Sequence, residues 1–217
     1  MIIRLYSIYG DVVSFTKGRI PKELKWSTTD GKIHCYVDSM VYKENIFKNS
    51  IALLIEPRSI QPDVYNFIEK KSSLFKYIFT HDSILLNKLK NTKPLLFGGV
   101  YGEYNIPKTK GISIVSSNKK ICELHKIRTD ICRQLKSNQK ATTIKVDCYG
   151  NFDGGKYATT EQIYGAYKYS IVIENYKDDY WFTEKICNAF ANKTVPIYYG
   201  ARKITDYFNS SGIIILA

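Results

Sequence analysis

Long hydrophobic runs are missing from this 217-residue sequence. Its longest apolar stretches, Ile51–Ile55 and Ile213–Ala217, span about five residues, whereas a transmembrane helix needs about 20. The start, Met1–Ile3 followed at once by Arg4, lacks the apolar core of a signal peptide. We therefore expect a soluble, cytoplasmic protein with no transmembrane segment, for which peripheral contact with a membrane stays open.

Patterned cysteines and histidines are also missing. The five cysteines are odd in number and include no C-x-x-C pair, which argues against a disulfide framework or a structural zinc site. Such cysteines fit small buried hydrophobes in a reducing compartment. The three histidines, His34, His81 and His125, are scattered, without a pair at metal-ligand spacing. No metal site is expected.

Several nucleotide-binding motifs are absent as well. There is no G-x-G-x-x-G, which disfavours a nicotinamide dehydrogenase, and no G-x-x-x-x-G-K-[ST] phosphate loop. No D-x-D pair is present to hold a metal-bound nucleotide sugar. Any nucleotide would have to be bound by protein cations and backbone groups instead.

Positive charge is abundant but dispersed. With 32 Lys and Arg against 20 Asp and Glu, the formal net charge is +12. Residues 1–108 and 109–217 each carry 16 basic and 10 acidic side chains. Nucleic-acid binders usually concentrate such charge on one face, so no nucleic-acid partner is expected. The even spread fits better with affinity for small polyanions such as nucleotide phosphates.

Short apolar strand patterns alternate with helical ones. Strands are predicted at 51–55, 77–79, 95–97, 112–116, 142–147, 169–173, 195–199 and 213–216, and helices at 62–74, 83–89, 121–135, 159–166, 183–191 and 204–208. The alternation predicts an α/β protein with parallel sheets. A link at 106–111 separates two such series, so we expect two Rossmann-like halves facing a cleft, at residues 1–105 and 106–217.

The helix predicted over 121–135 has an apolar stripe. Ile121, Leu124, Ile127, Ile131 and Leu135 repeat at helical spacing and predict its core face. Arg128 falls about 20° beyond the edge of that stripe. We therefore expect Arg128 to border the buried face.

Polar residues that end the predicted strands are the first candidates for a site, because ligands of open parallel sheets bind at the carboxyl ends of strands. They are Glu56, His81-Asp82, Ser117-Asn118, Asp147, Glu174-Asn175 and Gly200. His81 is expected to be a loop hydrogen-bonding residue.

The second half carries a specific series of motifs. They are Tyr167-Lys-Tyr-Ser-Ile-Val-Ile-Glu-Asn175, Thr183-Glu-Lys-Ile186 and Thr194-Val-Pro-Ile-Tyr-Tyr-Gly-Ala201, preceded by Ser117-Asn118, Arg128 and Val146-Asp147. Over roughly residues 112–211 this series resembles the α-1,3/4-fucosyltransferase family, glycosyltransferase family 10. The resemblance implies a two-domain GT-B architecture and inverting transfer of fucose from GDP-fucose to a glycan acceptor. Residues 1–105 would be the acceptor side and 106–217 the nucleotide-sugar side.

The resemblance also implies roles for individual residues. Arg128 and Lys185 would neutralise the leaving diphosphate without a metal, and no cofactor is implied. Glu184 would bind the ribose hydroxyls, while Asn175 and an aromatic residue would frame the diphosphate and sugar. The family tyrosine lies three residues before the glutamate, where this chain has Trp181. Either Tyr180 reaches the site through a one-residue bulge or Trp181 replaces it, and we favour Tyr180.

The catalytic base rests on a weaker similarity. Glu56 stands where the family has an acidic residue in a Gly-Glu-Asn segment, but its neighbours here are Ile55 and Pro57. Glu56 is therefore either the general base or a structural residue that pairs with Arg58 or caps the following helix.

Two features leave the overall function open. The family normally continues beyond the final apolar strand, so either a minimal or a truncated member is expected. The matched residues chiefly hold the nucleotide, so the same scaffold with another nucleotide sugar is an alternative. A non-catalytic relative that binds a nucleotide or a glycan is a second alternative.

Overall fold

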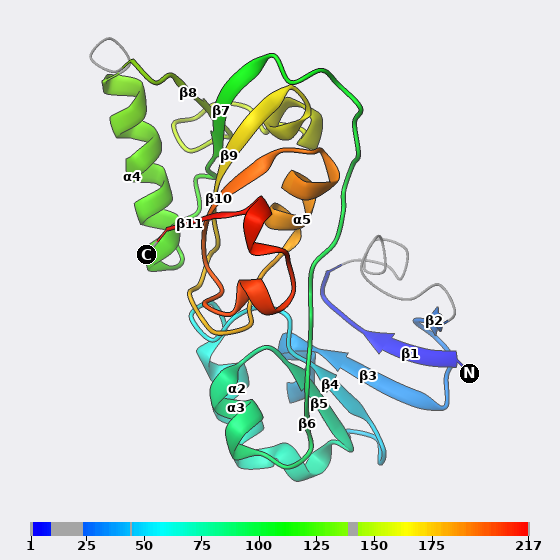
Figure 1. The fold of residues 1–217 in the computed structure, drawn as a ribbon. Coiled ribbons are helices and arrows are strands. Elements are labelled where there is room, and N and C mark those ends of the chain that lie inside the picture. The colour runs from blue at the N-terminus through cyan, green and yellow to red at the C-terminus, as the bar shows by residue number, and fades with distance from the viewer. Residues whose placement is uncertain (1, 10–23, 44, 139–142, 217) are drawn as a thin grey trace. The chain divides into compact units, whose positions relative to one another are not determined.

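The computed structural model of the chain describes residues 2–9, 24–43, 45–138 and 143–216. These residues form two compact units, each built on one parallel sheet (Figure 1). Unit 1 comprises the chain up to Phe97 together with Asp178–Trp181. Unit 2 comprises Gly98–Lys177 and the chain from Phe182 onward. The α/β class predicted from the alternating pattern is confirmed.

Unit 1 contains a six-stranded sheet with the order β2-β1-β3-β4-β5-β6, in which every pair is parallel. Its strands are β1 (Ile2–Tyr6), β2 (Lys25–Ser27), β3 (Ile33–Val37), β4 (Ile51–Leu53), β5 (Tyr77–Thr80) and β6 (Thr92–Pro94). Its helices are α2 (Pro62–Lys71) and α3 (Ser83–Lys88), with 3₁₀ turns η1 (Asp38–Tyr42) and η2 (Ser72–Leu74).

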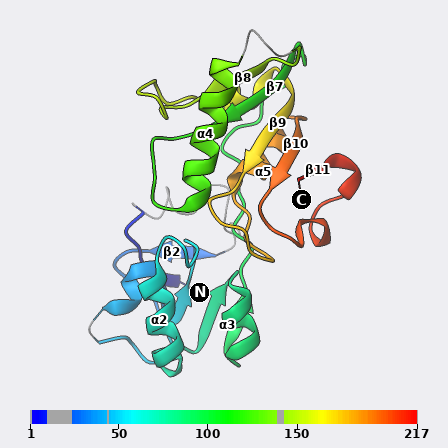
Figure 2. The same cartoon turned by 90° about the vertical axis from the view of Figure 1, so that its left-hand side faces the viewer.

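Both faces of the unit 1 sheet are covered by apolar side chains. On one face Tyr65 and Ile68 of α2 and Leu85 of α3 pack with Ala52 and Ile78 of the central strands. Figure 2 shows α2 and α3 beside these strands. A second cluster, which includes Leu5, Cys35 and Leu53, lies on the other face. Burial on both faces is typical of parallel sheets and explains the short continuous apolar runs in the sequence.

Unit 2 contains a five-stranded parallel sheet with the order β11-β10-β9-β7-β8. Its strands are β7 (Lys110–Val115), β8 (Val146–Tyr149), β9 (Tyr167–Ile173), β10 (Val195–Tyr199) and β11 (Ile214–Ile215). Its helices are α4 (Glu123–Ser137) and α5 (Glu184–Ala191), with a π-helical turn η3 (Glu161–Gly165) and 3₁₀ turns η4 (Ile204–Asp206) and η5 (Ser210–Gly212).

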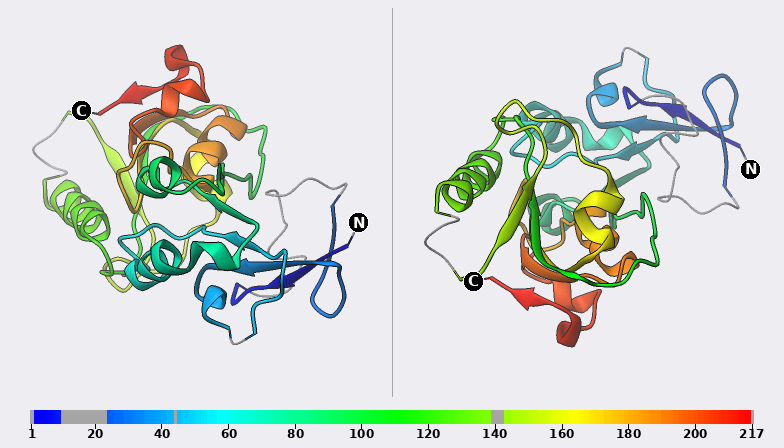
Figure 3. Two further views of the ribbon diagram at one scale, coloured as in Figure 1. Left: turned by 90° about the horizontal axis from the view of Figure 1, so that it is seen from below. Right: turned by 90° about the horizontal axis from the view of Figure 1, so that it is seen from above.

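The two long helices of unit 2 cover opposite faces of its sheet (Figure 3). Cys132 of α4 packs with Ile114 and Val146, whereas Ile186 of α5 packs with Tyr198 and other residues of a larger cluster. Thr183 caps α5 by accepting a hydrogen bond from the Lys185 amide. The cap places the first turn of α5 at the end of the sheet where β9 finishes.

Some predicted elements are wrong. The apolar run 95–97 is not a strand, because β6 is formed by the preceding Thr92–Pro94 and only Leu95 and Phe97 pack back onto the core. As an edge strand, β6 pairs with β5 alone and does not need apolar residues on both faces. The strand predicted over 142–147 is β8, at Val146–Tyr149. Ile144 is exposed, and residue 142 lies outside the described part of the chain.

The N-terminal strands β1, β2 and β3 were not predicted at all. The observed units also differ from the predicted division at residue 105, since the chain passes from unit 1 to unit 2 at Phe97–Gly98. A second difference is that Asp178–Trp181 packs with unit 1. Trp181 donates its indole N–H to the carbonyl of Ile55 at 3.1 Å, and the hydroxyl of Ser83 donates to Asp178 at 2.9 Å.

Two findings concern predicted absences. None of the helices in the described segments is long and apolar enough to cross a membrane. The five cysteines are all free thiols. Three of them, Cys35, Cys122 and Cys132, are buried, as expected of small apolar core residues.

Candidate functional site

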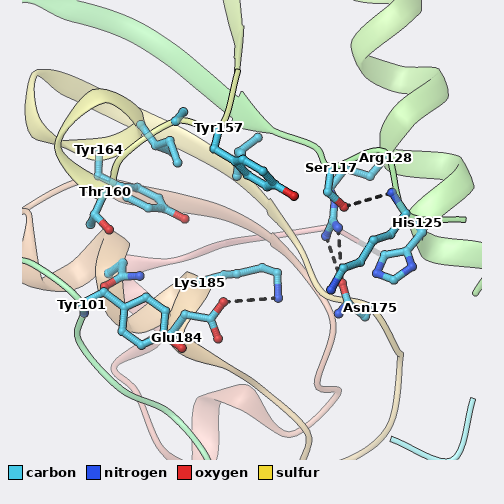
Figure 4. Close-up of a pocket in the computed structure, with 15 residues that line it drawn as sticks. Tyr101, Ser117, His125, Arg128, Tyr157, Thr160, Tyr164, Asn175, Glu184 and Lys185 are labelled. Atoms are coloured by element: carbon cyan, nitrogen blue, oxygen red, sulfur yellow. Dashed lines mark hydrogen bonds and ion pairs between the residues drawn. The ribbon is translucent and has the colours of Figure 1, made fainter. Parts of the chain in front are cut away.

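A pocket of about 350 Å³ opens in unit 2 where β7 and β9 end and where α4 and α5 begin (Figure 4). Four of the six predicted site residues line it, namely Arg128, Asn175, Glu184 and Lys185. They come from α4, from the end of β9 and from the first turn of α5. Residues distant in sequence thus meet at the carboxyl edge of the sheet, as expected for an open parallel sheet.

Arg128 is more deeply buried than its place beside the apolar stripe predicted, with only 6% of its surface exposed. One terminal nitrogen donates to the carbonyl of Ile173 at 2.6 Å, and both donate to Oδ1 of Asn175 at 3.3 Å. Its Nε is buried without a hydrogen-bond partner. Burial lowers the pKa of Arg128, while the charge of Glu174 opposes that shift. The pocket wall therefore holds a fixed cation with an unused donor.

The helix that carries Arg128 is turned differently from the prediction. Ile121 precedes α4 and is 60% exposed, and Ile127 is 40% exposed. The buried residues of α4 are Leu124, His125, Arg128, Thr129 and Cys132. The predicted core face is therefore confirmed for Leu124, which is buried, and for Ile131 and Leu135, which pack against the core, but it is wrong for Ile121 and Ile127. The reason is that polar residues with partners at the end of the sheet take up part of the buried surface of α4.

Lys185 is held by a carboxylate that the sequence analysis placed at a strand end but gave no role. Nζ of Lys185 lies 3.0 Å from Oε2 of Glu174, a fully buried side chain, and donates to the hydroxyl of Thr183 at 2.9 Å. Glu174 also accepts from the amide and hydroxyl of Thr183, at 2.9 and 2.8 Å. These contacts fix the ammonium group in one position at the pocket.

Gly200 leaves the room that Glu174 needs. A Cβ at this position would lie 2.6 Å from Cγ of Glu174 and 2.5 Å from the hydroxyl of Tyr198. Such distances are too short for any side chain without a shift of Glu174 or Tyr198. Gly200, which the sequence placed at a strand end, therefore acts through packing against Glu174.

Glu184 is the one carboxylate among the pocket-lining residues. It stands in the first turn of α5, half-buried, and its Oε1 lies 3.9 Å from Nζ of Lys185. A carboxylate at this place can accept hydrogen bonds from ligand hydroxyls. The predicted role of Glu184 toward a ribose is thus compatible with its position.

Other lining residues were missed by the sequence analysis. They include Tyr101, Lys119, His125, Tyr157 and Tyr164, whereas Ser117 was already a strand-end candidate. Tyr157 is 81% exposed and Tyr164 is buried, so the aromatic side of the pocket runs from solvent to the core. A detectable signal was the spacing of His125 and Arg128, three residues apart on one helix and thus neighbours on its surface.

Two predicted site residues lie outside this pocket, in unit 1. Tyr180 is half-buried in the segment 178–181. Trp181, the alternative for the family tyrosine, is buried beside His81, with ring centroids 5.8 Å apart. The indole is therefore a core residue of unit 1. His81 itself is buried, with Nε2 3.3 Å from the hydroxyl of Tyr65.

Glu56 lies three residues after Leu53, the last residue of β4, and hydrogen bonds hold its backbone on both sides. The carboxylate of Asp38 accepts from the amide of Ile55 at 2.7 Å and from that of Glu56 at 3.3 Å. The carbonyl of Glu56 accepts from the hydroxyl of Tyr65 at 2.7 Å. Asp38 has a positive φ of 47° and is buried, and burial raises its pKa to about 7.

The structural alternative for Glu56 required a partner or a cap. Arg58 forms ion pairs with Asp82 and Glu69, at 3.0 and 2.9 Å. Helix α2 begins at Pro62 without a side-chain cap. Arg58, the expected structural partner of Glu56, thus forms ion pairs with two other carboxylates.

Comparison with known proteins gave a family and a fold. The profile of the family described as "Glycosyltransferase family 10 (fucosyltransferase) C-term" matches residues 106–214. No curated protein sequence matched the chain.

Solved structures of an α1,3-fucosyltransferase share the fold. The structure with GDP has a TM-score of 0.60 and 16% identity, covering 99% of this chain and 72% of the other. The structure described without a ligand has a TM-score of 0.61 and 16% identity, with coverage of 99% and 71%.

Proposed function

Because this chain belongs to glycosyltransferase family 10, the fucosyltransferases, we propose that it transfers fucose from GDP-fucose to a hydroxyl of a glycan acceptor with inversion. The family makes it a glycosyltransferase and supports fucosyl transfer. The donor, the stereochemistry and the kind of acceptor are our proposal. The supporting observation is the pocket of unit 2, where Arg128, Asn175, Glu184 and Lys185 meet.

The charges in this pocket fit a nucleotide diphosphate. Arg128 and Lys185, with Lys119 at the rim, bring three cations against the single pocket carboxylate of Glu184. Guanidinium and ammonium groups held in place by other contacts stabilise phosphate oxygens without reorganising. Asn175, whose Oδ1 accepts from Arg128, adds a further polar side chain to the pocket. In this proposal Tyr180 contributes to the sugar side of the donor.

Inverting transfer needs a base for the acceptor. We assign that role to Glu56, which accepts the hydroxyl proton while the acceptor oxygen bonds to the anomeric carbon. The bond from that carbon to the diphosphate breaks in the same step, and the GDP leaving group takes the electron pair. The cations around the diphosphate offset the charge that develops on it. Unit 1 supplies the base and the acceptor side.

The donor is tested by measuring nucleotide release from GDP-fucose, from other GDP-sugars and from UDP-sugars, with and without galactose- and N-acetylglucosamine-terminated acceptors. We expect GDP-fucose to be preferred and acceptor to accelerate release. Preference for another sugar would support the same scaffold with a different donor. Binding of GDP-fucose without turnover in any acceptor mixture would support a non-catalytic relative.

The base is tested with Glu56→Gln, which keeps shape and hydrogen bonding but cannot accept the proton. Transfer should fall by roughly 10²–10⁴-fold, while GDP binding stays near that of the wild type. Asp30→Asn is a control, since it removes an exposed carboxylate elsewhere in unit 1. Near-normal transfer by the glutamine variant would reject Glu56 as the base.

A further inference from the structure

His125 lines the pocket, and the proposed function gives it no role. It lies on α4 one turn before Arg128 and is only 2% exposed. Figure 4 places its ring beside Asn175, at the same end of the pocket as Arg128. Residues three apart on a helix are surface neighbours, so both side chains reach the same wall.

Two buried nitrogens in this wall have no hydrogen-bond partner. Among the described residues that line the pocket, Nδ1 of His125 and Nε of Arg128 are buried without a hydrogen-bond partner. Burying a polar atom without a partner is unfavourable, and such atoms at a pocket often mark the place of a ligand. Nε of Arg128 is a donor, and Nδ1 of His125 is a donor when the ring is protonated, so an acceptor would satisfy both.

The charged groups around the imidazole determine whether a neutral or an anionic acceptor would bind there. Arg128 stands on the same helix, Lys119 comes from the loop after β7, and Lys185 comes from α5; all three repel a proton on His125. Asn175, after β9, favours the protonated ring. Glu184 is on α5, and Glu174 is bound to Lys185 and Thr183. Burial and then Arg128 lower the pKa of His125 to about 4.

A diphosphate reverses this balance. It brings two negative charges to the cations, and an opposite charge within a few ångströms shifts a pKa by about 1–3 units toward the charged form. With its pKa raised by about two units from about 4, an imidazole that is neutral without the anion is mostly protonated with it near pH 5.

We propose that His125 is a further donor-binding residue, which takes up a proton from solvent when a nucleoside diphosphate sugar binds and then donates a hydrogen bond to a diphosphate oxygen. This inference rests on the proposed function, because it needs that ligand in this pocket. It adds a third phosphate-binding side chain to Arg128 and Lys185, and it makes donor affinity depend on pH.

The test measures proton uptake by calorimetry. GDP-fucose is titrated into the protein without acceptor, between pH 5 and 7.5, in two buffers of different ionisation enthalpy. GDP-fucose suits this purpose because each of its phosphates carries one strongly acidic proton, whereas the terminal phosphate of GDP has a second ionisation near 6. If binding raises the pKa by two units, uptake is about 0.8 proton at pH 5 and affinity is about tenfold tighter than at pH 7.5.

His125→Asn is the decisive variant, since it keeps a hydrogen-bonding side chain that does not titrate. We expect it to bind GDP-fucose with negligible proton uptake and little change in affinity over this range. Lys126→Gln is the matched control, because it removes a cation from the neighbouring exposed position of α4 that does not line the pocket. The control should keep both the uptake and the pH dependence.

A measurement on the wild type covers the case that the asparagine variant misfolds. The chain has three histidines, so their imidazole signals can be followed by NMR, and the His125 signal should move to the protonated form at pH 5 when GDP-fucose is added. Binding without uptake, uptake retained in His125→Asn, or an unmoved signal each overturns this inference and leaves the proposed function standing. A UDP-sugar that binds with His125-dependent uptake, in place of GDP-fucose, overturns the donor and keeps the inference. No binding of either nucleotide sugar overturns both.

Discussion

Arg128 has a structural contact as well as a place in the pocket. Its bonds to the Ile173 carbonyl and to Asn175 tie α4 to the end of β9, while its Nε is left for a ligand. Substitution therefore affects folding as well as binding. The place of Arg128 near an apolar stripe suggested a marginal position, but its partners bury it.

Arg128→Ala should lower kcat/KM for the donor by about ten- to a hundred-fold, because it removes a charge-assisted contact worth roughly 1.5–3 kcal/mol. It should also lower the melting temperature by several degrees, since the buried Ile173 carbonyl loses a donor at a cost of about 1–3 kcal/mol. Steady-state kinetics and thermal melts on one preparation check both effects. Unchanged donor kinetics with a lowered Tm would leave Arg128 a purely structural role.

Asp38 makes the stability of unit 1 depend on pH. Its pKa, raised by burial to about 7 from an ordinary 3.8, means that the folded state binds its proton more tightly than the unfolded state. The stabilisation is therefore fully present below about pH 4 and is lost as the pH rises toward 7, to an extent on the order of 4 kcal/mol. Asp38→Asn removes this titration and keeps an oxygen for the Ile55 amide.

Urea unfolding of both proteins at pH 4, 5, 6 and 7 checks this prediction. Relative to the wild type, Asp38→Asn should gain stability as the pH rises. Asp30→Asn, at an exposed position, should follow the wild-type profile. Parallel profiles for Asp38→Asn and wild type would contradict a raised pKa at Asp38.

At the scale of elements, the start of α5 is the part of unit 2 on which the pocket depends most. Thr183 caps the helix, binds Glu174 and contacts Nζ of Lys185. The end of β9 supplies Glu174 and the start of α5 supplies Glu184 and Lys185, so one strand end and one helix start position three charged groups. The sequence predicted a helix beginning at Thr183 but not the buried carboxylate of Glu174 behind it.

Gly200→Ala should displace Glu174 and, with it, the Lys185 ammonium group that Glu174 binds. The new methyl group would overlap Cγ of Glu174 and the Tyr198 hydroxyl, and overpacking of this kind costs about 1–3 kcal/mol. Donor KM should rise because Lys185 moves with Glu174, and Tm should fall. Gly154→Ala is a control with open space around the added carbon, although its φ of +84° adds local strain. Wild-type KM in Gly200→Ala would show that the pocket does not depend on the Glu174 position.

For the whole molecule, the net charge of +12 is distributed evenly along the chain, yet the pocket of unit 2 gathers three cations. Folding thus brings together three cationic side chains that are separated in the sequence. These cations are the basis for expecting that a metal ion is not needed to stabilise the leaving group.

Transfer should therefore survive EDTA at concentrations that strip divalent ions, with kcat/KM within about twofold of the untreated enzyme; such a change is under about 0.5 kcal/mol. The assay compares EDTA-treated and untreated protein, then adds Mn²⁺ or Mg²⁺ back. A loss of most activity that Mn²⁺ alone restores would mean that Arg128 and Lys185 do not suffice.

Local patterns in the sequence were enough for the fold class and for part of the pocket. Apolar runs such as Ile51–Ile55 and Val195–Tyr199 showed buried parallel strands, because both faces of such strands are covered. The motifs around Asn175 and Thr183–Lys185 marked residues that do line the pocket. These patterns involve residues that are close together in the sequence. They can therefore be recognised without knowing which segments contact each other in the fold.

The tertiary structure alone decided what depends on distant partners. The rotation of α4, with Ile127 exposed and His125 buried, follows from the hydrogen bonds of Arg128 to the end of β9. The packing of Trp181 in unit 1 follows from the Ile55 carbonyl, 126 positions away in the chain. The edge strands β6 and β8 have one neighbour each, and their limits are set by pairing with β5 and β7. In each case a polar partner or a strand register far along the chain outweighs the local apolar pattern.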